Sequence, residues 1–232
     1  ALDTRFTRTT RHSLFALLAG VLTALLAPGL PADAAPQVPG LGRGFTDVAP
    51  EPAVSTDVVT ATAAAVPDTV RPGGDVVVKL VLDIRKPWHI WPAAQQPREG
   101  EFATFDDAIP LSVNVGSVSP SLTVHSGFTQ WPEIHGVTAD IGDGPLKYAV
   151  LEGRSVVLMP VTVAADAAPG DASFTFELGF QACDDDGCLQ PSSGVKVPVS
   201  LRIAGAGEPV EAAPPDVDVA GFDPTTWGRI HS

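Results

Sequence analysis

Cys183 and Cys188 are the only two cysteines of this 232-residue chain, and four residues separate them. Three of the four are aspartates, Asp184, Asp185 and Asp186, and the fourth is a glycine. A thiol pair at this spacing can form a structural disulfide, help to bind a metal ion, or exchange electrons with other proteins. Each use predicts a different kind of protein.

A disulfide inside this loop would add little stability. Such a bond stabilises mainly by restricting the unfolded chain, and a ring of about six residues gains only roughly 2 kcal/mol. A bond that joins distant strands gains on the order of 3–5 kcal/mol. Close pairs are also the ones that can open and close without unfolding the protein. The spacing therefore leaves a structural bond and a redox-active bond equally open.

The sequence gives little support to a metal site. Structural zinc sites normally draw four Cys or His ligands, and His89, His125 and His135 lie elsewhere without ligand spacing. The run Asp-Asp-Asp-Gly lacks the alternating ligand positions and the distal glutamate of a calcium loop. We therefore expect no metal and no other cofactor.

The three aspartates bear on the redox hypothesis. Their negative charge should raise the pKa of the neighbouring thiols, because it destabilises a thiolate. A smaller thiolate fraction at neutral pH slows reaction with random disulfides. If the carboxylates face the sulfurs, the pair should give electrons to a chosen partner and resist casual exchange.

The N-terminal segment indicates export. Three arginines precede an uncharged run at residues 14–26, and a small-x-small triplet, Ala-Asp-Ala, ends at residue 34. The run is shorter than the about 20 apolar residues that span a membrane. We predict a Sec-type signal peptide at residues 1–34, a periplasmic or otherwise exported protein, and no membrane insertion of the mature chain. Disulfides persist in such a compartment.

The charge balance excludes some classes of partner. The formal net charge is −13, and the sequence has no basic cluster. A chain this acidic is not expected to bind nucleic acid or anionic membrane surfaces.

Short β-type runs separated by Gly- and Pro-rich turns begin at about residue 57. Residues 172–180 alternate, so that Phe174, Phe176 and Leu178 share one face. Similar runs occupy residues 75–84, 111–119, 155–163 and 195–203. With almost no helical periodicity, this pattern predicts an all-β protein with an immunoglobulin-like β-sandwich over residues 57–203.

The segments on either side of the predicted sandwich differ from it in composition. Residues 35–56 are rich in Pro, Gly and Ala and predict a disordered linker. Residues 204–232 form a Pro/Ala-rich acidic tail, which we expect to be extended and mobile.

The segment around the cysteines resembles the signature loop of the N-terminal domain of the thiol:disulfide interchange protein DsbD. In that family a strand ends in Tyr/Phe-Gln-x-Cys, and a short polar loop, a second cysteine, an apolar residue and a proline follow. The positions that fit are Gln181, Ala182, Cys183, Cys188, Leu189 and Pro191. Residues 87–91, 131–136 and 146–163 also resemble the family, so the resemblance covers roughly residues 57–203.

The resemblance implies a periplasmic immunoglobulin-like domain that relays reducing equivalents. Its electrons would come from a thioredoxin-like donor and pass to oxidised envelope proteins, such as disulfide isomerases or cytochrome c maturation partners. The resemblance further implies that Cys188 forms the mixed disulfides and that Cys183 resolves them. As an enzyme, the chain would be a thiol–disulfide oxidoreductase module of the protein-disulfide reductase type.

Other residues would tune or shield the pair. Gln181 and the three aspartates are candidates for tuning the loop, and Trp88, Trp131 and Tyr148 are candidates for aromatic shielding. The family also shields its cysteines with a flexible cap loop, for which residues 131–148 are the candidate segment here.

The sequence departs from the family in three ways. The loop is unusually acidic, and Gln190 stands where a second proline is common. A complete interchange protein also needs several apolar spans and a Cys-x-x-Cys module, and neither follows residue 204. We therefore expect either a free-standing relay domain fed by separate proteins or one piece of a longer protein. An exported binding or assembly module with a purely structural disulfide is the alternative.

Overall fold

The structure is a computed structural model, and it describes residues 51–232 except 99, 101, 104, 106 and 141–143. The predicted signal peptide and most of the predicted linker lie outside the described residues.

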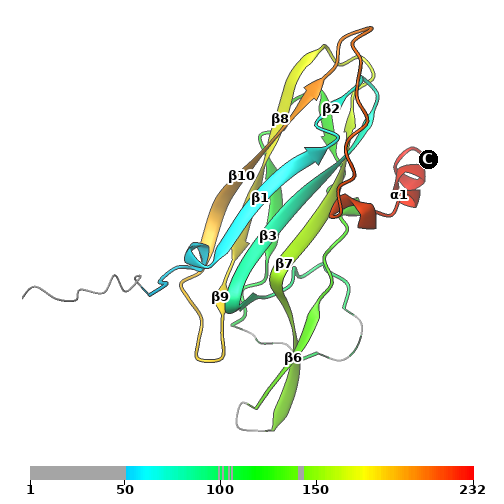
Figure 1. Cartoon of the computed structure of the whole chain (residues 1–232). Coiled ribbons are helices and arrows are strands. Elements are labelled where there is room, and N and C mark those ends of the chain that lie inside the picture. The colour runs from blue at the N-terminus through cyan, green and yellow to red at the C-terminus, as the bar shows by residue number, and fades with distance from the viewer. Residues whose placement is uncertain (1–50, 99, 101, 104, 106, 141–143) are drawn as a thin grey trace, which may run out of the picture. The chain divides into compact units, whose positions relative to one another are not determined.

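Two β-sheets pack face to face, which confirms the predicted all-β sandwich (Figure 1). The first sheet has the strand order β1 (Val59–Val66), β3 (Asp75–Ile90), β7 (Pro145–Val163) and β5 (Leu122–Val124). In this sheet β6 (His135–Asp140) also pairs with β7, and β9 (Ala182–Cys183) pairs with β3. The second sheet has the order β2 (Thr69–Val70), β10 (Ser192–Ile203), β8 (Gly170–Phe180) and β4 (Ser112–Gly116).

Helical segments are few and short in the described part of the chain. They are three 3-10 turns, η1 (Ser55–Asp57), η2 (Ser126–Phe128) and η3 (Val219–Gly221), and one α-helix, α1 (Thr225–Ile230).

The core lies between the two sheets and is built from alternating side chains. Phe174, Phe176 and Leu178 of β8 are at most 1% exposed, as their alternation predicts. The facing layer includes Leu80 and Leu82 of β3, which are fully buried. Burial of side chains of this size contributes about 1.5–3 kcal/mol each and supplies most of the free energy that holds the sheets together.

The C-terminal segment corrects the expectation of a mobile tail. Figure 1 shows it, in orange to red, running back along the sandwich from β10 towards α1. Lys79 Nζ of β3 donates to carboxylate oxygens of Asp216 at 2.6 Å and Asp218 at 2.9 Å. Arg154 of β7 donates to Asp218 at 2.7 Å. The acidic residues of the tail therefore match basic residues on the outer face of the first sheet, a pairing that composition does not reveal.

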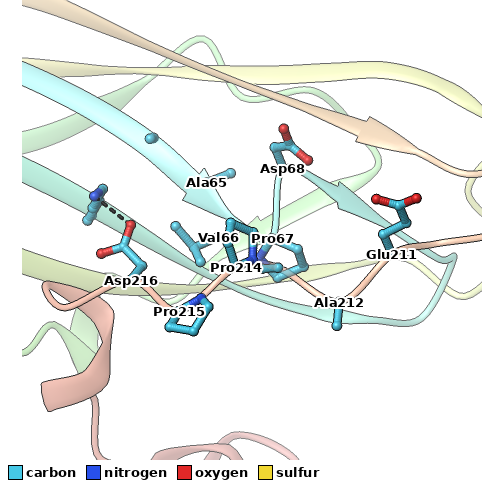
Figure 2. Close-up of a pocket in the computed structure, with 12 residues that line it drawn as sticks. Ala65, Val66, Pro67, Asp68, Glu211, Ala212, Pro214, Pro215 and Asp216 are labelled. Atoms are coloured by element: carbon cyan, nitrogen blue, oxygen red, sulfur yellow. Dashed lines mark hydrogen bonds and ion pairs between the residues drawn. The ribbon is translucent and has the colours of Figure 1, made fainter.

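The tail also packs against the end of β1. In Figure 2, Pro214 and Pro215 lie beside Val66 and Pro67, and a dashed line joins Asp216 to the Lys79 amine. Farther along the tail, His231 Nε2 lies 3.1 Å from the Asp75 carboxylate at the start of β3.

A break in the β3–β7 pairing positions the cysteine region. Ile84 pairs with Gly153, whereas the next pair along β3 is His89 with Glu152, so four residues of β3 bulge out between them. Beyond the bulge, His89 and Ile90 pair on their other side with β9. The end of β3 thereby forms a support for the first cysteine.

Candidate functional site

The two cysteines form a disulfide at one end of the sandwich, with their Cα atoms 4.0 Å apart. Cys183 belongs to β9 and is 3% exposed, whereas Cys188 is exposed. Figure 1 shows the loop between β9 and β10 at the same end of the sandwich as the arm made by β6 and the start of β7. One sulfur of the pair is thus carried by a solvent-exposed residue and the other by a buried one.

The loop between the cysteines is a tight turn closed by Asp184. The backbone N–H of Asp184 donates to the Gly187 carbonyl at 2.8 Å. Oδ1 of Asp184 accepts hydrogen bonds from the backbone N–H groups of Asp186 and Gly187, both at 3.0 Å. Short polar side chains commonly close turns in this way. Asp185 and Asp186 are exposed, and the loop-tuning role of all three aspartates stays a prediction.

Hydrogen bonds fix the base of the loop to the sandwich. Gln181 Nε2 donates to the Leu189 carbonyl at 3.1 Å, across the two ends of the loop. Ser55 Oγ accepts from the backbone N–H of Ala182 at 3.0 Å and donates to the Gln190 carbonyl at 2.9 Å. Ser55 is fully buried. It lies in the segment that the sequence assigned to the linker, where nothing marked it as part of the site.

A cleft of about 550 Å³ opens beside the disulfide. Its wall opposite the loop is formed by the end of β3, the β6–β7 arm and the connection before β4, through His89, Trp91, Phe105, Thr138, Ala139 and Tyr148. The rings pack closely, since the centroids of Trp91 and Tyr148 are 5.5 Å apart and those of His89 and Tyr148 are 5.9 Å apart. The predicted cap segment therefore contributes residues to this cleft, and its capping role stays a prediction.

The structure brings one of the three proposed shielding residues to the disulfide. Tyr148 lines the cleft. Trp88 and Trp131 are partly buried against the hydrophobic core and do not line it. Strand alternation accounts for the difference at Trp88, because its neighbour His89 points to the opposite face, together with Trp91. Phe105 lies in a long connection, and no sequence pattern indicated it.

The cleft holds two titratable side chains with perturbed pKa values. Burial lowers the pKa of His89, while the negative charges of Asp185, Asp184 and Glu152 oppose that shift. Burial, and then the charge of Asp185, raises the pKa of Tyr148. At neutral pH the cleft therefore contains an uncharged imidazole and an uncharged phenol below an acidic loop.

Two kinds of feature are absent from the described residues. No group of three or more His, Cys, Asp or Glu side chains is arranged to hold a metal ion among them. In the same part of the chain, no helix has both the length and the apolar character needed to cross a membrane.

Comparisons with known proteins found distant structural similarities. No family model and no curated protein matches the chain. The N-terminal periplasmic domain of ScsB from Proteus mirabilis is similar at 15% identity and a TM-score of 0.32, over 63% of this chain and 46% of that chain. The match thus spans less than half of the ScsB chain.

Cohesins give similar values. A non-cellulosomal cohesin from the archaeon Archaeoglobus fulgidus aligns at 13% identity and a TM-score of 0.33, over 64% of this chain and 94% of that chain. The seventh ScaB type I cohesin from Pseudobacteroides cellulosolvens aligns at 8% identity and a TM-score of 0.31, over 65% and 97% of the two chains. Similarities at this level carry no functional information.

Proposed function

We propose that this protein is an exported thiol–disulfide exchange module, which relays reducing equivalents between a thioredoxin-like donor and oxidised envelope proteins. The observation that carries the proposal is the unequal exposure of the two cysteines. Cys188 is exposed, and Cys183 is 3% exposed. In disulfide exchange one sulfur has to be reached by a partner's sulfur, whereas the other needs to reach only the first. Cys188 fits the first role and Cys183 the second.

The surroundings of the loop support a bond that opens locally. Each end of the loop is tied to the rest of the protein by bonds that do not involve sulfur, including those of Ser55 and Gln181. The turn itself is closed by the Asp184 carboxylate. These contacts hold the two thiols near each other after reduction, which favours rapid re-formation of the bond.

The residue-by-residue resemblance of the cysteine loop to the DsbD N-terminal family supports the class of partner. Thioredoxin-like proteins are the proposed donors, and oxidised envelope proteins, including disulfide isomerases or cytochrome c maturation partners, are the proposed acceptors. No cofactor takes part in the proposed exchange, because both half-reactions occur between cysteine sulfurs.

A redox titration tests the proposal. The protein is equilibrated in dithiol/disulfide buffers of graded potential, alkylation-shift gels follow the cysteines, and circular dichroism follows the fold. We expect reversible opening at a potential accessible to thioredoxin-like donors, with the β-sheet signal unchanged. A bond that resists reduction until the sandwich unfolds would instead support the binding-module alternative with a structural disulfide.

Two matched single substitutions test the direction of exchange. Cys183→Ser leaves the exposed sulfur without its resolving partner and should accumulate mixed disulfides with a thioredoxin-like protein. Cys188→Ser leaves only the buried sulfur and should accumulate few. Equal trapping by both variants would contradict the assigned roles, and trapping by neither would contradict the exchange function.

A further inference from the structure

His89 lies directly opposite Cys183 in the pairing of β3 with β9. Residues opposite each other in an antiparallel pair place their side chains on the same face, with Cβ atoms about 4.5–5.5 Å apart. Both residues also line the cleft beside the disulfide. On its other side, Cys183 forms an isolated β-bridge with Cys188, its disulfide partner. His89 therefore neighbours Cys183 on the same face of the sheet, on the side away from Cys188.

The environment of His89 suits a group that holds a proton only briefly. The residue is 7% exposed, and burial keeps its imidazole neutral at neutral pH. The charged groups that act on the ring are Asp184 and Asp185 from the loop and Glu152 from β7. All three are acidic, so they stabilise an imidazolium once it forms. Tyr148, the other titratable side chain beside the ring, is uncharged at neutral pH.

A buried thiol needs such a neighbour. The nucleophile in disulfide exchange is the thiolate, and burial together with nearby carboxylates raises the pKa of a thiol. Water has little access to Cys183 at 3% exposure. A proton acceptor inside the cleft would remove this barrier.

We propose that His89 is the proton acceptor for the Cys183 thiol when Cys183 resolves a mixed disulfide. This inference rests on the proposed exchange function. In the reduced protein, the Cys188 thiolate attacks a partner disulfide, a mixed disulfide forms, and one partner thiolate leaves. The Cys183 thiol then transfers its proton to a ring nitrogen of His89, and its sulfur attacks Sγ of Cys188.

The step balances in atoms and electrons. The Cys183–Cys188 bond forms, the bond between Cys188 and the partner breaks, and the second partner thiolate leaves. The two partner thiolates take up two protons, one released by Cys188 and one returned by His89. Two thiols of this protein are oxidised to a disulfide, and the partner disulfide is reduced to two thiols. Electron flow into the oxidised protein follows the same steps in reverse.

The test uses the reduced protein and the aromatic disulfide dithiobis(nitrobenzoate), which releases a coloured thiolate at each step. The first release reports attack by Cys188, and the second reports resolution by Cys183. In His89→Gln the second release should slow by at least about tenfold at neutral pH, since general-base assistance in enzymes contributes about 10²–10⁴-fold. The first release should change little. The control is His125→Gln, because His125 is a partly buried histidine that does not line the cleft.

Two further readouts separate proton transfer from a structural role. Raising the pH towards the thiol pKa should bring His89→Gln and the native protein to the same second rate, because the thiolate then forms without a base. In His89→Ala, free imidazole should restore the second release, since the substitution leaves space for an imidazole ring in the cleft beside Cys183. If the rate loss persists at high pH and imidazole has no effect, His89 is a positioning residue and the inference is wrong.

The outcomes for the two proposals are distinct. If the native protein exchanges with a thioredoxin-like protein and His89→Gln resolves at the native rate, the inference falls and the exchange function stands. If the native disulfide opens only on unfolding, both fall.

Discussion

Reduction of the disulfide should weaken the fold only modestly. The bonded residues are five apart in sequence, which gives a ring of about six residues. The chain-entropy relation predicts that the bond lowers the entropy of the unfolded chain by about 7 cal/mol/K. Reduction should therefore lower the free energy of unfolding by roughly 2 kcal/mol at room temperature. Domains of this size are typically stable by about 5–15 kcal/mol, so the reduced sandwich should stay folded.

The structure gives a reason for this expectation beyond loop entropy. The core between the sheets includes Phe174, Phe176, Phe180, Leu80 and Leu151, which are at most 1% exposed, and none of them belongs to the cysteine loop. Loss of the bond leaves this packing intact, and the loop keeps the hydrogen bonds at its base.

Urea denaturation of the oxidised and reduced protein, followed by circular dichroism, provides the measurement. The free energy of unfolding should fall by about 2 kcal/mol with little change in the dependence on urea, and the melting temperature by roughly 4–8 °C. A loss above about 4 kcal/mol, or a collapse of the β-sheet signal on reduction, would refute the reasoning. It would show that the loop holds the sandwich together and would remove the basis for a reversible relay.

Three further predictions concern the contacts around the loop and the tail. Ser55→Ala leaves a buried backbone N–H of β9 without an acceptor, so the free energy of unfolding should fall by about 1–3 kcal/mol in urea denaturation, and an unchanged midpoint would contradict this. Asp184→Ala removes both side-chain hydrogen bonds of the turn, whereas Asp186→Ala removes the same charge and no side-chain hydrogen bond. Only Asp184→Ala should speed amide hydrogen exchange in the turn. Equal exchange rates in the two variants would contradict the role of Asp184 in closing the turn. The hydrogen bond with Lys79 lowers the pKa of Asp216 below its ordinary 3.8. The pair therefore stabilises the docked tail fully above pH 3.8, and this stabilisation is lost as the pH falls through the lowered pKa. Tail release, followed by the fluorescence of Trp227, should therefore begin below pH 3.8. In Lys79→Met the pH at the midpoint of release should be higher, and an unchanged midpoint would argue against the pair.

The strands could be predicted because apolar and polar side chains alternate along them, which indicates one buried face. The apolar residues of the run at residues 75–84 are nearly continuous and do not alternate with polar ones. Continuous runs indicate strands covered on both faces. Val77 and Val81 are indeed buried, although they lie on the face of β3 turned away from the core cluster. The tail runs along that face, and its Asp216 and Asp218 bond to Lys79, which lies between the two valines. The nearly continuous apolar run fits such a cover, although the composition of the tail led us to expect a mobile segment.

The site could be predicted only where chemistry is local in sequence. The cysteine spacing and the neighbouring aspartates indicate the loop directly. Ser55 reaches the loop from more than a hundred residues away, and its hydroxyl looks like any other in a polar segment. Phe105 contributes a ring from a connection without periodicity. His89 stands opposite Cys183 because of a four-residue bulge in β3, and the register of a bulged strand does not follow from side-chain alternation.

The geometry bears on the selectivity that we expect of the proposed exchange. From the sequence, we expect the negative charge of the acidic run to raise the pKa of the thiols and to slow their reaction with random disulfides. In the structure, two backbone N–H groups donate to Oδ1 of Asp184, and Asp185 and Asp186 are exposed to water, which weakens their effect on the thiols without removing it. The buried sulfur is instead enclosed by β9, the end of β3 and the aromatic wall of the cleft. In the proposed exchange, a partner would reach Cys188 beside this wall, so we expect the shape of the cleft, as well as the loop charge, to restrict which disulfides react.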